Sequence, residues 1–187
     1  MIEAIIGLVG VIVGSAITIM KDSWTSWRAN RREGSYSAIR LIGMLEEYAD
    51  RCLDVVYDEG TAQGRPAART EDGQEYHEAQ VRTPDPLQYP DDIGWRSLPE
   101  ALMHRTIALP NKARSTNRHI QASSEWAGPP DYREFFEPRQ IGYARLGLDA
   151  LEIANDLRIH FGISAESRDH LNPDWNPMDA LRERISK

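Results

Sequence analysis

The chain opens with a run of seventeen residues, Ala4 to Met20, that contains no charged side chain. As a helix with a rise of about 1.5 Å per residue, this run spans roughly 26 Å, close to the hydrocarbon thickness of a bilayer. The residues after Met20 are polar enough for that part of the chain to be soluble in water. The run therefore predicts a single N-terminal transmembrane anchor, residues 1–20, that carries one soluble domain with a modest core.

Two other interpretations of the apolar run remain open. A cleaved signal peptide usually begins with a basic leader and ends in small residues before the cut site, whereas this run follows Met-Ile-Glu and ends in Ile-Met-Lys. A helix buried in the core of a soluble protein is the second alternative, because seventeen residues are at the short end for a membrane span. We expect a retained anchor.

Basic residues cluster directly after the run, and this predicts the orientation of the chain. Residues 21–34 form a basic juxtamembrane helix that contains Lys21, Arg28, Arg31 and Arg32. By the positive-inside rule, the N-terminus lies outside and the C-terminal body faces the cytoplasm. The same arginines can reach anionic lipid headgroups.

Two tryptophans, Trp24 and Trp27, fall where the aromatic belt of a membrane helix would lie. They are predicted to be membrane-interface residues together with the basic side chains. The alternative is that both belong to the core of a soluble helix.

Small residues recur within the predicted anchor. Gly10 and Gly14 form a Gly-x-x-x-Gly pair, and Thr18 continues the same row. Gly7 lies one helical turn before Gly10. Small residues in such a row let two helix backbones approach closely in lipid. We therefore expect that the chain can form a homo-oligomer through its anchor.

Charge and cysteine content limit the partners of the body. Residues 21–40 carry a net charge of +3, so the residues after them carry −9. Phosphate affinity comes from Lys and Arg, so a nucleic-acid partner is not expected. The single cysteine, Cys52, rules out an intrachain disulfide and falls on an apolar helix face, so we interpret it as a core residue.

The sequence predicts an all-α fold for the soluble domain that follows the anchor. The helix that follows the anchor can end near Gly34 or continue, and from Ala38 to Val56 apolar residues return every three or four positions. Their face is wide enough to contact two neighbouring helices. The predicted fold is a single transmembrane helix followed by a three- to four-helix bundle over residues 35–187, with a long irregular acidic loop.

That loop is residues 58–96, which contain four glycines, four prolines and nine acids against four arginines. It shows no periodicity, which is typical of a functional or disordered excursion. Its end, Tyr89 to Trp95, mixes aromatic and acidic residues and can pack back onto the bundle.

Three later helices are expected if Pro110 only kinks the first of them, and four if Pro110 ends it. A capping box at Ser97 starts one that Pro110 kinks or ends, and residues 111–127 look helical again. A second capping box at Asp131 opens the strongest periodic segment, which Gly162 terminates after Phe161. A short helix covers residues 178–185, and no strand is expected.

Candidate chemistry is sparse. Asp149, Glu152, Asp156 and His160 form one stripe of a helix, but the stripe points away from the apolar face and Arg145 lies one turn from Asp149. We interpret it as a solvated, salt-bridged face, and we predict no metal, cofactor or catalytic residue.

The polar helix around residue 115 is the best candidate for a protein-partner surface, through Arg114, Arg118 and His119. A helix that is polar nearly all round often bridges elements or meets a partner. The leading hypothesis is therefore a membrane-anchored cytoplasmic interaction or scaffold protein. A sensory bundle linked to the membrane and an enzyme with a non-local site are the alternatives.

Overall fold

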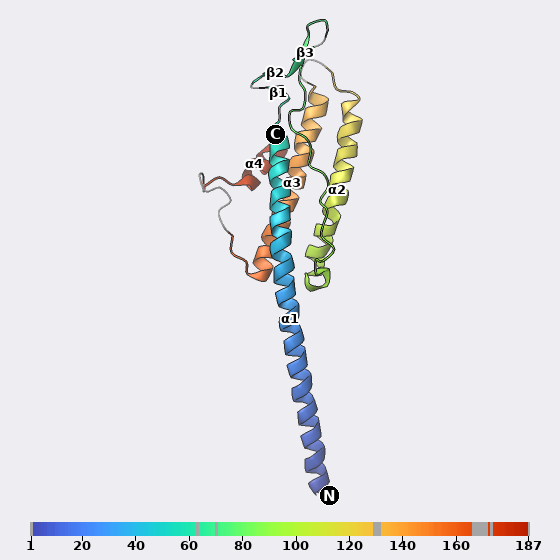
Figure 1. The fold of residues 1–187 in the computed structure, drawn as a ribbon, viewed down its shortest axis with the longest axis vertical. Helices are drawn as coiled ribbons and strands as arrows, with labels where there is room; N and C mark the ends of the chain where they lie inside the picture. Colours follow the sequence, from blue (N-terminus) through green and yellow to red (C-terminus); the bar gives the residue numbers. More distant parts are fainter. Residues whose placement is uncertain are drawn as a thin grey trace.

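The computed structural model describes residues 2–62, 64–69, 71–128, 132–165, 172 and 174–186, and for residues 2–19 and 68 it describes the backbone alone. The chain is mostly helical, and its four α-helices pack together, which confirms the predicted helical bundle (Figure 1). The helices are α1 (Ile2–Tyr57), α2 (Glu100–Ser124), α3 (Arg133–Phe161) and α4 (Pro177–Ser186).

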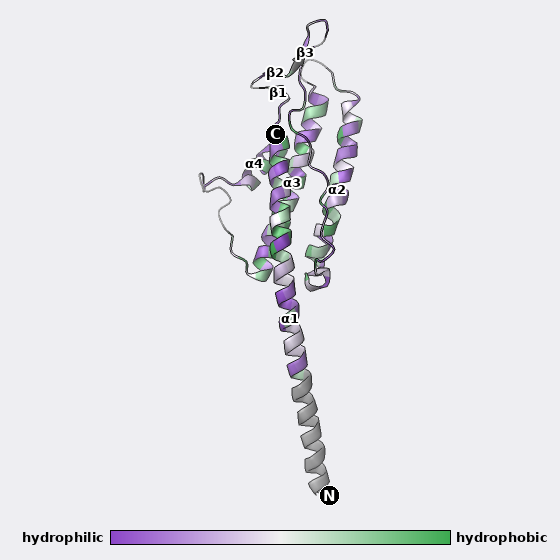
Figure 2. Cartoon of the chain, in the orientation of Figure 1, coloured by the Kyte–Doolittle hydropathy of each residue, from purple (hydrophilic) through white to green (hydrophobic). Residues whose placement is uncertain are grey.

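Helix α1 is continuous through Gly34, so the alternative of a helix end there is wrong. Every residue from 20 to 33 is exposed, and this segment, which we call the stalk, projects from the bundle (Figure 1). The predicted apolar seam is confirmed, because the residues on it are buried: Ala38, Ile42, Leu45, Ala49, Cys52 and Val56. Figure 2 shows the change from the polar stalk to the more apolar helix inside the bundle.

Helix α3 makes the most extensive contact with α1. Small residues on α3 allow the two backbones to come close: Ala150 and Ala154 are fully buried, and a Cβ built on Gly147 would lie 3.0 Å from the Cβ of Cys52. Helix α2 packs on α3, and α4 covers α3 at the end of the bundle distant from the stalk. The predicted end at Gly162 is confirmed by its left-handed backbone, with a φ of 67°.

The acidic segment between α1 and α2 departs from the prediction in one respect. Two short antiparallel pairs, β1 (Thr61–Ala62) with β2 (Arg65–Pro66) and β3 (Ala68–Arg69) with β4 (Glu75–Tyr76), form where no strand was expected. Each pair is only two residues long, so the alternation that reveals longer strands is absent from the sequence.

The rest of the acidic segment runs back along the bundle toward the stalk. Ile93 is buried, and Val81, Leu87, Tyr89 and Trp95 pack against the core, which confirms that the end of the segment returns to the bundle. A 3₁₀ turn, η1 (Trp95–Ser97), then leads into α2.

Helix α2 differs from two expectations. The alternative that Pro110 ends the helix is wrong, because the helix runs through it to Ser124. A proline cannot donate to the carbonyl four residues earlier, that of Thr106, and the Tyr89 hydroxyl donates to this oxygen instead, at 2.8 Å. Ser97 is not the N-cap, because the helix starts after Pro99 and the Ser97 hydroxyl donates to Gly94 O within η1.

The start of α3 is also uncapped, and Tyr132 precedes it with a φ of 50°. Asp131, predicted as its cap, lies outside the described residues. Asn176 does cap α4, since its Oδ1 accepts the Met178 N–H at 3.0 Å.

Within the residues whose side chains are described, no helical stretch combines the length and the apolar character needed to cross a bilayer. The predicted anchor lies almost wholly outside that part of the chain. The association row of Gly7, Gly10, Gly14 and Thr18 lies outside it as well.

Candidate functional site

The stalk presents the predicted interface residues on its surface. Trp24 is 62% exposed and Trp27 56%, so the alternative that they are core residues of this chain is wrong. Their ring centroids are 6.2 Å apart, and the Arg31 guanidinium lies 5.5 Å from the Trp27 ring centroid, within cation–π distance. Lys21, Arg28 and Arg32 are exposed on the same stalk.

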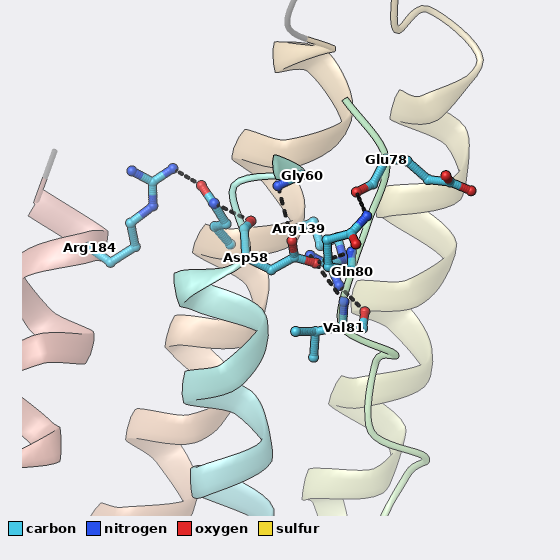
Figure 3. Close-up of polar contacts among 8 residues, drawn as sticks. Asp58, Gly60, Glu78, Gln80, Val81, Arg139 and Arg184 are labelled. Atoms are coloured by element: carbon cyan, nitrogen blue, oxygen red, sulfur yellow. Dashed lines mark hydrogen bonds and ion pairs between the residues drawn. The ribbon is translucent and has the colours of Figure 1, made fainter. Parts of the chain in front are cut away.

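A buried ion pair lies at the opposite end of α1 (Figure 3). Asp58 directly follows the last residue of α1, and Arg139 projects from α3; both side chains are only 1% exposed. Arg139 Nη1 is 3.0 Å from Asp58 Oδ2, although it is not aligned for a hydrogen bond, and Nη2 donates to the carbonyl of Val81.

Three backbone N–H groups surround the same carboxylate. Gly60 donates to Oδ1 at 3.0 Å, and Gln80 and Val81 each donate to Oδ2 at 3.0 Å. Burial raises the pKa of Asp58, but the three N–H groups and the Arg139 charge outweigh burial, and the pKa falls below its ordinary value. Asp58 therefore stays ionised and holds the acidic segment against the end of α1.

The polar network extends from this ion pair to α4. Gln140 donates from Nε2 to the Asp58 carbonyl at 2.7 Å, and Arg184 donates to Gln140 Oε1. Gln140 is buried, and a buried amide needs hydrogen-bond partners for both its nitrogen and its oxygen. These two bonds supply them. The network joins the end of α1 to α3 and α4 (Figure 3).

A cavity of about 520 Å³ adjoins the network on the α4 side. Its lining mixes apolar groups from α1 and α3 with charged groups of both signs. The charged and amide residues are Glu59, Arg133, Glu137, Gln140, Glu183 and Arg184. A cavity of this size and polarity can hold a small polar molecule.

A second hollow of about 650 Å³ lies between α2 and α3. His119 lines it, whereas Arg114 and Arg118, the other two predicted partner residues, do not. Both arginines are exposed, and Arg114 donates to Asn111 Oδ1 at 2.6 Å. The structure therefore does not gather the three residues in one recess.

The acidic stripe of α3 is salt-bridged as predicted, but with different partners. Asp149 pairs with Lys112 at 2.7 Å and Asp156 with Arg105 at 2.5 Å, so these bonds join α3 to α2 rather than to Arg145. Among the described residues, no group of three His, Cys, Asp or Glu side chains converges as a metal site would require.

Sequence reasoning missed the pair of Asp58 and Arg139. One signal was available for Arg139, because it stands four residues before Tyr143 and continues the buried row of α3 toward its start. Asp58 gave no such signal, since it opens a segment without periodicity.

Comparison with models of protein families, with curated proteins and with solved structures finds no match for this chain.

Proposed function

We propose that this chain is a single-pass membrane protein whose helical bundle serves as a cytoplasmic interaction or scaffold domain. Residues 1–20 are the anchor, and the stalk joins it to the bundle. The observation that carries the proposal is the continuity of α1, which runs from Ile2 to Tyr57 without a break and supplies one face of the core. A continuous helix transmits position and orientation from the lipid to the bundle.

The surface of the stalk supports the same proposal. Two exposed tryptophans, Trp24 and Trp27, and then three exposed arginines follow the charge-free run, and both residue types are common at the interfacial ends of membrane helices. Exposed Trp side chains cost free energy in water, and an interface between lipid and water relieves that cost.

Self-association through the anchor is part of the proposal. Gly7 and Gly43 are separated by roughly ten turns at 3.6 residues per turn, so they share one side of α1. Nothing lies within 4 Å of a Cβ built on Gly43, and Tyr36 and Ile39 beside it are exposed. The bundle thus leaves open the side of α1 on which the anchor carries its small residues.

Attachment is tested by fractionation of the full chain and of a variant that lacks residues 1–20. We expect the full chain in the membrane pellet after an alkaline carbonate wash and the shortened chain in the supernatant. Reporter fusions at both termini give the sidedness. Both forms in the supernatant would reject the proposal.

The scaffold role is tested separately by purification in a mild detergent. A homo-oligomer or a stoichiometric protein partner supports it, whereas a monodisperse monomer without a partner counts against it. Gly10→Ile with Gly14→Ile should reduce any homo-oligomer, because bulky residues keep the two backbones apart.

A sensory role is the second candidate, and the cavity beside Arg184 favours it. The cavity lies where α1 ends and touches α3 and α4, so a bound molecule would contact three helices at once. Ala180→Trp should fill the cavity. A sensor predicts that this change alters the proportion of oligomer in detergent, whereas a passive void predicts no change.

A further inference from the structure

A small recess lies where the stalk enters the bundle. It has a volume of about 240 Å³, and Trp27, Asn30, Arg31, Ser97, His160 and Phe161 line it. The six residues come from α1, from η1 and from the last turn of α3. No acidic residue is among them, although the chain as a whole carries a net charge of −7.

Gly34 explains why these three elements meet. A Cβ built on Gly34 would lie 2.7 Å from the Ser97 carbonyl oxygen and 2.8 Å from the Phe161 ring, so only glycine allows the approach. The left-handed residue Gly162 then ends α3 directly after Phe161. The recess is therefore formed by backbone geometry as well as by side chains.

The lining offers several hydrogen-bond donors and positive charge. Arg31 lies over the Trp27 ring at 5.5 Å, and His160 packs edge-on against Phe161 with centroids 4.8 Å apart, so both side chains have fixed neighbours. Arginine, histidine and asparagine N–H groups are the donors that bind phosphate oxygens.

The recess lies on the side of the predicted anchor that carries the basic residues. Arg31 follows the end of the charge-free run by roughly 16 Å at 1.5 Å per residue, which is farther than the headgroup layer of about 5–7 Å extends. Its long side chain leans toward the N-terminus, as helical side chains do, and so reaches back toward the headgroups. Trp27, a predicted interface residue, lines the same recess. A tryptophan at the headgroup level would place the recess there too.

We propose that this recess binds the phosphate group of an anionic phospholipid headgroup, with Arg31 and His160 as its principal ligands and Asn30 as a further donor. The inference rests on the proposed membrane attachment. It adds a defined binding site to a general attraction between basic residues and the bilayer, and it places the base of the bundle on the lipid surface.

The test uses the full chain in a neutral detergent and native mass spectrometry with phosphatidylglycerol. Arg31→Gln and His160→Gln should each weaken lipid retention by up to about fivefold, the upper end for a charged contact between exposed groups. Arg96→Gln is the matched control, since Arg96 is exposed, stands next to Ser97 and is not among the residues that line the recess, and the change should alter retention less than twofold. Helical circular dichroism confirms that each variant folds.

Two results would overturn the proposal. Equal losses for Arg31→Gln and Arg96→Gln, with none for His160→Gln, would mean diffuse attraction without a site. Inorganic phosphate that displaces the lipid and binds alone in an Arg31-dependent way would identify free phosphate as the occupant. A chain that binds phosphatidylglycerol here but fails the carbonate test would reject the anchor and leave the recess standing.

Discussion

At the scale of single residues, the ion pair of Asp58 and Arg139 is the contact on which the far end of the bundle depends. A carboxylate just after the end of a helix meets the negative end of the helix dipole, which is unfavourable. Here three backbone N–H groups and one guanidinium offset that cost and the cost of burial. Removing either charge leaves the other buried without its partner.

Asp58→Asn should therefore lower the free energy of unfolding by about 3–5 kcal/mol, the cost of leaving a buried charge unpaired. Urea unfolding of the full chain in detergent, followed by circular dichroism, measures the change. Glu47→Gln is the control, because Glu47 is 66% exposed in its pair with Arg51 and should contribute less than about 0.5 kcal/mol. Similar small losses for both variants would contradict this account.

The same pair predicts a dependence on pH. The pKa of Asp58 is lower in the folded chain than its ordinary value, so its stabilisation is complete above the unfolded pKa of about 3.9. The stabilisation is lost as the pH falls through the folded pKa. The stability gap between the native chain and Asp58→Asn should be constant from pH 5 to 8 and shrink below about pH 4. A gap that closes near pH 6 would assign the effect to another group.

Tyr89 and Pro110 should be energetically coupled through one carbonyl. Tyr89→Phe leaves Thr106 O without its donor and should cost about 1–3 kcal/mol. In a Pro110→Ala background the new N–H can donate to the same oxygen, so the cost of Tyr89→Phe should fall below about 1 kcal/mol. A double-mutant cycle on urea unfolding measures the coupling. Equal costs in both backgrounds would show that the hydroxyl does not replace the missing bond.

At the scale of elements, two glycines of α1 have opposite surroundings. Gly34 faces the Ser97 backbone and the Phe161 ring at under 3 Å, whereas Gly43 faces open space. One is required by packing, and the other weakens the helix, since glycine is a poor helix former.

Gly34→Ala should therefore lower the free energy of unfolding by about 1–3 kcal/mol, because the new methyl group forces η1 or α3 to move. Gly43→Ala should raise it by up to about 1 kcal/mol. Thermal unfolding of the two variants side by side provides the comparison. Changes of the same sign would contradict the described junction between the stalk and the bundle.

The elements also show how far the sequence could predict this fold. The spacing of Ala38 to Val56 identified the buried face of α1, because periodicity is a local property of the chain. The effect of Pro110 on α2 could not be predicted from the local sequence, because it depends on the hydroxyl of Tyr89, which precedes Pro110 by twenty-one positions. The Asp58 pair was missed for the same reason, since its partner is eighty-one residues away and no local pattern encodes the contact.

At the scale of the whole molecule, α1 connects two regions with different chemistry. The stalk carries exposed aromatic and basic groups, and the far end carries the buried network of Asp58, Arg139, Gln140 and Arg184. Helices α3 and α4 and the turn η1 contact α1, and the side of α1 that includes Gly43 stays open. Under the proposed function, α1 fixes the distance between the buried polar network and the lipid, and its open side is available to a second copy of the chain.

The most direct measurement of this arrangement is the depth of α1 in a lipid nanodisc. Spin labels are placed singly by Ile12→Cys, Trp24→Cys or Gly43→Cys in a Cys52→Ala background. Collisions with oxygen report lipid, and collisions with a water-soluble nickel complex report water. We predict that the label at position 12 collides with oxygen alone, that the label at position 24 shows both, and that the label at position 43 meets nickel. A label at position 12 that is open to nickel, or shielded from both probes, would contradict a rod that runs from the bilayer into the bundle.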